Sequence, residues 1–195
     1  GKSYIRHIRD EEIVRVQNDA GFEATNNFSR VSEVDVIIIC VPTPLSKNRE
    51  PDLAPVLNTG ISLVPYLQKG QLVVLESSTY PGTTDTELST VLERSGLKKD
   101  QDFFLAYSPE REDPGNESFC TSNIPKIIGA DTPEARELAA AVYEGVISEV
   151  IPVDSSRTAE AIKLTENIFR SVNIALVNEL KVIFDAMDID VWDVI

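Results

Sequence analysis

The chain has 195 residues, of which 42% are hydrophobic and 26% are charged, and this composition is typical of a globular protein with one large domain, or one domain and part of a second. Its formal net charge of −14 argues against nucleic acid or an anionic membrane as a partner, and no apolar run reaches the ~20 residues of a membrane span. Two cysteines and one histidine argue against a disulfide framework, a zinc site and a Ser-His-Asp triad, so we expect a cytoplasmic protein without a metal.

Strands and helices are predicted to alternate along the first 153 residues. A helix is expected at 10–20, where acidic residues open the segment and Gly21 follows it. Residues 35–41 are a continuous apolar run that Pro42 stops, which is typical of a strand buried on both faces. Further strands are predicted at 71–76, 103–107, 126–128 and 149–153. Further helices are predicted at 53–68 with an interruption near Pro65, at 84–95 with a Thr84–Glu87 capping box, and from Pro133. This order predicts an α/β fold with a doubly wound, mostly parallel sheet.

The organisation changes after Pro152, because residues 153–195 contain neither Gly nor Pro. Ser155 or Ser156 can cap a helix that continues to about Met187, a length of roughly 45 Å. Its apolar positions cover more than one face, which is typical of a helix that connects domains or forms a dimer. The sequence thus divides into a sheet domain at 1–153 and a long helix at 154–195.

Three motifs directly follow predicted strands, and ligands bind at the carboxyl ends of strands in open α/β sheets. The first, Val-Pro-Thr-Pro at 41–44, is either a stiff loop beside a ligand or an ordinary loop that ends a strand. The second, at 76–84, offers Ser78 and Thr79 to a phosphate, a carboxamide or a reacting water, while Thr83 and Thr84 are expected only to cap a helix.

The third motif, at 107–116, places Glu110 where it can act as a general base, whereas residues 111–113 are expected to be a polar surface loop. On the long helix, Lys163 and Asn167 share one face at i, i+4 spacing and could together hold an oxyanion. Glu160 and Ser171 extend this polar line, and the alternative interpretation is a solvated helix face.

Neither cysteine is expected to be an activated nucleophile. Cys40 lies within an apolar strand, where a thiol behaves as a small buried hydrophobe, and Cys120 lies in a polar loop with no nearby histidine in sequence. His7 is expected to be an exposed surface residue. The nine glycines form neither the dinucleotide fingerprint G-x-G-x-x-G nor a P-loop.

Five stretches together resemble the UDP-glucose/GDP-mannose dehydrogenase family. They are Ile-Cys-Val-Pro-Thr-Pro at 39–44, Glu-Ser-Ser-Thr-Tyr-Pro-Gly-Thr-Thr at 76–84, Ser-Pro-Glu at 108–110, Lys-Leu-Thr-Glu-Asn at 163–167 and Asp-Val-Trp-Asp-Val-Ile at 190–195. They occur in the order and with the spacing of the family over essentially the whole chain. The form of the third motif is most similar to the branch that acts on UDP-N-acetylhexosamines, particularly UDP-N-acetylglucosamine 6-dehydrogenases.

The resemblance implies a function for each motif. Family members oxidise the C6 alcohol of a UDP-sugar to a carboxylate with two NAD, through a cysteine-bound intermediate that water hydrolyses. By this resemblance Thr79 and Glu110 would position or deprotonate water, and Lys163 and Asn167 would stabilise the oxyanion. The NAD site would be lined by Val41, Pro42, Thr43, Ser78 and Thr79. The long helix would be the central helix of a homodimer.

The chain also departs from the family pattern. It begins just after the βαβ unit with the glycine fingerprint, and the nucleophilic cysteine and the UDP-binding domain would follow Ile195. We therefore expect a chain truncated at both ends and inactive alone. The strand at 36–41 is expected to have a bare apolar edge, because the preceding strand would pair with it. Pro114 occupies a position where many relatives carry a second Glu.

Two alternatives stay open at this point. One is another dehydrogenase with a Rossmann domain and a long helix, of the β-hydroxyacid or 6-phosphogluconate type, because those enzymes also carry a Lys-x-x-x-Asn pair. They do not need Val-Pro-Thr-Pro or Ser-Pro-Glu, which favours the first interpretation. The other is a non-catalytic dimerisation or binding fragment.

Overall fold

The computed structural model describes residues 2–5, 8–111 and 123–194 of the chain, so the predictions for His7, Cys120, Pro114 and residues 112–113 lie outside the described residues. A five-stranded sheet has the order β1-β2-β3-β4-β5. Its strands are β1 (Val36–Ile39), β2 (Leu72–Leu75), β3 (Phe104–Tyr107), β4 (Lys126–Ala130) and β5 (Val150–Val153). All neighbouring strands are parallel except β3 and β4, which confirms the predicted mostly parallel sheet.

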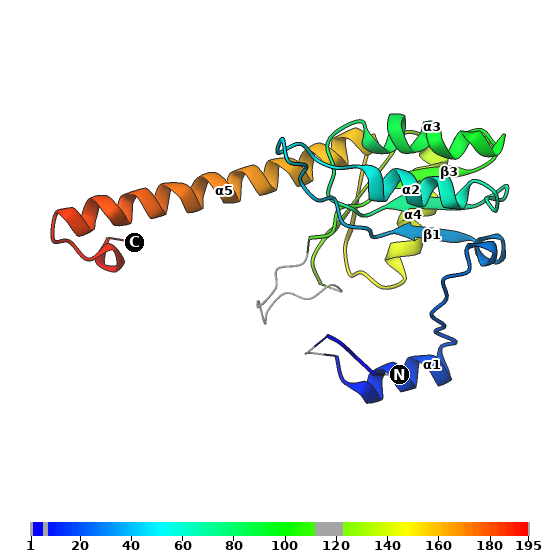
Figure 1. Cartoon of the computed structure of the whole chain (residues 1–195), viewed down its shortest axis with the longest axis horizontal. Coiled ribbons are helices and arrows are strands. Elements are labelled where there is room, and N and C mark those ends of the chain that lie inside the picture. The colour runs from blue at the N-terminus through cyan, green and yellow to red at the C-terminus, as the bar shows by residue number, and fades with distance from the viewer. Residues whose placement is uncertain (1, 6–7, 112–122, 195) are drawn as a thin grey trace.

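Helices cover both faces of the sheet (Figure 1). Side chains of β2 alternate between two cores: Val73 and Leu75 pack in one cluster, Leu72 and Val74 in the other. The first cluster includes side chains of α2 (Ala54–Leu63), of η2 (Thr83–Leu88) and α3 (Ser89–Leu92), which the short 3-10 helix η3 (Glu93–Ser95) follows, and of the start of α5. The second includes α4 (Pro133–Glu144). Because both faces are buried, β2 reads as a continuous apolar run in the sequence.

The strand β1 differs from this pattern. Ile39 is buried, but Ile38 is 45% exposed and Cys40 is exposed, so the prediction that the thiol is buried was wrong. The reason is position: β1 lies at the edge of the sheet, and on this face only its Val36 packs against the cluster of α4, whereas both Leu72 and Val74 of β2 are buried in that cluster. Its outer edge pairs with no strand among the described residues, as expected for a bare edge.

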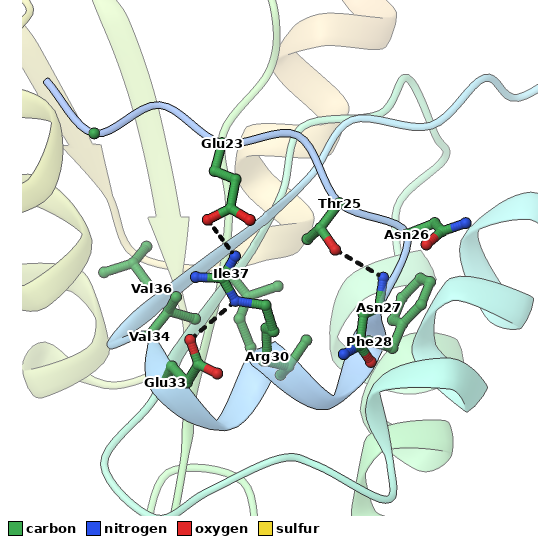
Figure 2. A pocket seen from close by; sticks show the side chains of 12 residues that line it. Glu23, Thr25, Asn26, Asn27, Phe28, Arg30, Glu33, Val34, Val36 and Ile37 are labelled. Atoms are coloured by element: carbon green, nitrogen blue, oxygen red, sulfur yellow. Dashed lines mark hydrogen bonds and ion pairs between the residues drawn. The ribbon is translucent and has the colours of Figure 1, made fainter. Parts of the chain in front are cut away.

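A pocket of about 380 Å³ lies beside the start of β1 and is drawn in Figure 2. The 3-10 helix η1 (Phe28–Glu33) and the loop before it form its walls, with Val36 and Ile37 of the strand. Arg30 reaches across the pocket to Glu23 at 2.6 Å and to Glu33 at 3.0 Å. The helix α1 (Asp10–Asp19), predicted at 10–20, has no buried residue and lies apart from the sheet (Figure 1).

The predicted helix at 84–95 has a different form. It begins as a π-helix, η2, whose N-cap is Gly82 with a positive φ of 104°. Thr84 is therefore inside the helix, and the expected Thr84–Glu87 capping box was wrong. The predicted helix at 53–68 was correct in type, but α2 ends at Leu63, before Pro65.

The last helix, α5 (Ser156–Ala186), has 31 residues, and Ser155 caps it by accepting a hydrogen bond from the Thr158 amide. The predicted long helix and its cap are thus confirmed. Only its first turns pack on the sheet, and the rest projects away from it (Figure 1). Within the described ranges no helix has an apolar stretch that would reach across a bilayer, and no group of three metal-binding side chains is found.

The absence of a side chain at Gly129 in β4 sets the approach of α5. A Cβ atom at this position would lie 2.3 Å from the Ser155 carbonyl oxygen and 2.7 Å from the Ala159 Cβ. Close by, Asp131 accepts hydrogen bonds from the Ser156 amide and hydroxyl, both at 3.2 Å. The start of α5 is therefore held against β4 at a distance that only glycine permits.

We predict that Gly129→Ala destabilises the protein, because the added Cβ meets the α5 backbone rather than a movable side chain. Overpacking of this kind costs roughly 1–3 kcal/mol or more. Urea unfolding followed by circular dichroism measures the loss. The matched control is Gly145→Ala, where the nearest atom lies at an ordinary 3.7 Å. Equal stability of the two variants would contradict the prediction.

Candidate functional site

The loops that follow β1 and β2 are joined at the carboxyl edge of the sheet. The Val41 amide donates to Ser77 Oγ at 3.0 Å, and the Ser77 hydroxyl donates to the Val41 carbonyl oxygen at 2.7 Å. Ser77 is buried and links the first two motifs. The sequence around Ser77 did not predict this role. The Val-Pro-Thr-Pro loop is therefore fixed to the strand beside it.

The residues predicted to line a cofactor differ in exposure. Pro42 and Ser78 are exposed, whereas Val41, Thr43 and Thr79 are partly buried. Thr43 Oγ1 is itself buried and has no hydrogen-bond partner among the described residues. An unpaired buried hydroxyl is costly, so this loop suits a ligand that supplies the missing hydrogen bond.

The loop at 79–84 is fastened to α5 by Glu160, a carboxylate with no exposed surface. Glu160 accepts hydrogen bonds from the Thr84 hydroxyl at 2.7 Å, the Thr84 amide at 2.9 Å and the Gly82 amide at 2.7 Å. Thr79 Oγ1 lies 3.4 Å from the same carboxylate. Burial raises the pKa of Glu160, although these hydrogen bonds oppose the shift. The carboxylate caps η2 from another element, which explains why no local capping box is used.

Residues 110–111, which follow β3, are held by the next two turns of α5. Lys163 is buried, and its Nζ donates to the Glu110 carbonyl oxygen at 2.5 Å. Arg111 donates to the Pro125 carbonyl oxygen and to Glu166, both at 2.6 Å. The prediction that Arg111 is only a surface residue was therefore wrong, as was the alternative of a solvated Lys163. Glu110 itself is exposed.

Asn167 stands apart from these contacts. It is exposed one turn beyond Lys163, and its Oδ1 accepts a hydrogen bond from Arg170 at 3.4 Å. The structure thus brings Thr79 and Glu110 to one end of α5 with Lys163, and leaves Asn167 at the border of this group.

A second polar cluster, which we call the Glu76 cluster, consists of Cys40, Glu76, Lys126 and Tyr143. The Glu76 carboxylate accepts from Tyr143 Oη at 2.5 Å, pairs with Lys126 Nζ at 2.9 Å and lies 3.7 Å from Cys40 Sγ. Lys126 Nζ also lies 5.1 Å from the centre of the Tyr143 ring. Although the Cys40 residue is exposed as a whole, its thiol is partly removed from water. This partial burial raises the pKa of the thiol, as burial raises that of the Tyr143 hydroxyl, and the Glu76 carboxylate raises both further. Sequence reasoning missed this cluster because its members come from four separate elements.

We predict that the Cys40 thiol reacts slowly with iodoacetamide at neutral pH, because burial and the Glu76 charge raise its pKa and the thiolate is the reacting form. In a Cys120→Ser background, Glu76→Gln is expected to speed alkylation roughly two- to tenfold, because it removes a charge that raises the pKa of the thiol. The pH dependence of the alkylation rate measures the shift. Glu144→Gln, an exposed substitution on α4, is the control, and identical midpoints in all three proteins would contradict the prediction.

Comparison with known proteins agrees with the motifs. Residues 1–147 match the NAD binding domain of the UDP-glucose/GDP-mannose dehydrogenase family, and residues 157–195 match its central domain. Protein CapL of Staphylococcus aureus is 42% identical over 91% of this chain and 42% of its own length. UDP-N-acetyl-D-glucosamine 6-dehydrogenase of Pseudomonas aeruginosa is 42% identical over 85% of this chain and 40% of its own length.

A solved structure, the UDP-D-ManNAc dehydrogenase of Pyrococcus horikoshii, superposes with a TM-score of 0.90 at 32% identity, and the match covers all of this chain and 47% of that one. The chain spans about two fifths of the length of the curated relatives named above. Its Rossmann-type sheet and the matched NAD binding domain identify NAD as the cofactor of this fold. The chain belongs to the UDP-glucose/GDP-mannose dehydrogenase family of NAD-dependent nucleotide-sugar dehydrogenases.

Proposed function

We propose that the protein carrying this chain oxidises the C6 alcohol of a UDP-N-acetylhexosamine to the carboxylate with NAD. The observation that carries the proposal is the attachment of the second and third motifs to the start of α5. Glu160 binds the 79–84 loop, and the buried Lys163 donates to the Glu110 carbonyl oxygen. Support for the sugar class comes from the relatives named for UDP-N-acetylglucosamine and UDP-N-acetylmannosamine. In this proposal residues 1–153 form the NAD-binding unit, and 154–195 begin the middle domain.

The proposed NAD site follows the loops at the sheet edge. Val41, Pro42, Thr43, Ser78 and Thr79 would line it, and the unpaired Thr43 hydroxyl offers a hydrogen bond to the dinucleotide. Two NAD would be used in turn, and each would take one hydride from the sugar C6 carbon on the way from alcohol to carboxylate. The Val41–Ser77 hydrogen bonds fix this wall, so the cofactor would meet a preformed surface.

The protein side chains are proposed to take a proton from water and to stabilise negative charge on the substrate. Thr79 and Glu110 would hold a water or take its proton, since a hydroxyl and an exposed carboxylate flank the same helix end. Lys163 would stabilise negative charge on the reacting oxygen, because an ammonium has three donors and the Glu110 carbonyl takes one of them. Asn167 would add an amide donor from the next turn.

We predict that Lys163→Met lowers kcat for NADH formation by about 10²–10³-fold, the usual effect of removing one oxyanion donor. The assay follows NADH absorbance in the protein carrying this chain, with UDP-N-acetylglucosamine, UDP-N-acetylmannosamine and UDP-glucose as substrates. Lys98→Met, at an exposed position away from the site, should keep the parent rate. An undiminished kcat in the Lys163 variant would remove Lys163 from the reaction, and no NADH from any UDP-sugar would reject the proposed oxidation.

The far part of α5 supports a second part of the proposal, a homodimer through this helix. Large apolar side chains stay exposed along its projecting half: Ile168, Phe169, Val172, Ile174, Leu176, Val182 and Ile183, with Met187 and Trp192 beyond its end. Phe169 is 71% exposed. A helix with many large exposed apolar side chains favours an interface, and two copies of it can bury these side chains by twofold symmetry.

We predict that Phe169→Glu weakens the dimer, because it places a charge in the apolar surface that the second copy would cover. Light scattering over a range of protein concentrations measures the mass. Phe22→Glu introduces the same charge at an exposed aromatic residue outside α5 and should leave the mass unchanged. A single mass shared by the parent protein and both variants would argue against an α5 interface.

A further inference from the structure

The burial of Glu160 needs an explanation beyond packing. Its carboxylate has no exposed surface, and removing such a group from water is costly unless hydrogen-bond donors replace the water. A Ser or Thr N-cap would satisfy the first amides of η2 at a smaller cost. What a local cap does not provide is a link to another element, and Glu160 provides that link between α5 and the 79–84 loop.

The link involves both oxygens of the carboxylate. Oε1 accepts from the amide and the hydroxyl of Thr84, while Oε2 accepts from the amide of Gly82. Gly82 has a positive φ, so it is the point where the loop turns back toward α5. The loop is therefore fixed on both sides of its turn, and Thr79 lies at its start, 3.4 Å from the same carboxylate.

The same side of α5 also fixes the loop of Glu110. Glu160, Lys163 and Glu166 follow each other at i, i+3 and i+6, a spacing that keeps them on one side of the helix. Lys163 bonds to the Glu110 carbonyl oxygen, and Glu166 pairs with Arg111. Two turns of one rigid helix thus hold two loops that are separate in the sequence.

We propose that Glu160 is a positioning residue for the oxidation: through Gly82 and Thr84 it holds Thr79 in place relative to Glu110 and Lys163. The inference rests on the proposed function, in which Thr79 contacts the reacting water. Positioning matters because a displacement of about 1 Å at a catalytic group can lower a rate by about 10²-fold. Glu160 itself would touch neither NAD nor the sugar.

The test is Glu160→Gln in the protein carrying this chain. Glutamine has nearly the same shape, but its amide nitrogen cannot accept a hydrogen bond, so either Gly82 or Thr84 loses its acceptor. We expect kcat to fall about ten- to hundredfold while the KM for NAD changes less than about threefold. Hydrogen exchange of the peptide amides at 79–84 is expected to accelerate about tenfold, with exchange in β2 unchanged.

Two further variants keep the test decisive. Thr84→Val removes only the hydroxyl donor to Glu160, and it should change exchange and kcat in the same direction by a smaller factor if Glu160→Gln fails to fold. Glu137→Gln, at an exposed position of α4, is the matched control and should behave as the parent protein.

The outcomes separate this inference from the proposed function. Exchange that stays slow at 79–84, or that rises equally in β2, would overturn the positioning role, as would an unchanged kcat when the loop exchanges faster. Absence of NADH formation by the parent protein would instead reject the oxidation. The exchange measurement would then still decide whether Glu160 fastens the loop.

Discussion

The candidate site depends on the close approach of α5 to β4 at Gly129. With the Ser155 carbonyl oxygen 2.3 Å from the place of a Cβ, the helix lies nearer to the sheet than any other residue would allow. This approach buries Ala159 completely and brings Glu160 and Lys163 under the loops that leave β2 and β3. A single missing side chain therefore fixes where the polar side of the helix meets the carboxyl edge of the sheet.

The carboxylates on the two faces of the sheet are stabilised differently. Glu76 has a cation, Lys126, within 2.9 Å, whereas the hydrogen bonds that Glu160 accepts from the 79–84 loop all come from neutral groups. Burial raises the pKa of Glu160, so the folded state binds its proton more tightly than the unfolded chain does. Its contribution to stability thus falls as the pH rises from the unfolded value of about 4.3 toward the folded pKa. The ionised Glu160 therefore destabilises the folded state at neutral pH, which favours the interpretation that Glu160 positions the 79–84 loop.

Periodicity predicted the elements of this chain well, but not their ends or their long-range contacts. The apolar runs identified the sheet, and the lack of Gly and Pro after residue 152 identified α5. The prediction of a capping box was wrong because the Thr84 hydroxyl donates to the carboxylate of Glu160, a residue 76 positions away. Cys40 was expected to be buried because an apolar strand sequence does not reveal how far helices cover each of its faces. The contacts of Arg111 and the Glu76 cluster were missed because the partners come from elements that are distant in the sequence.

The polar groups at the carboxyl edge divide into two sets, and the division suggests how the site would work. Ser77, Thr84 and Glu160 already have protein partners, and they hold the loops in place. Thr43 Oγ1 has no partner in the described part of the chain, and Ser78 is exposed. A ligand would supply hydrogen bonds to the second set without disturbing the first. The hydrogen bonds of the first set form before any ligand binds. The loops therefore lose their conformational entropy during folding and not during binding, as preorganised sites require.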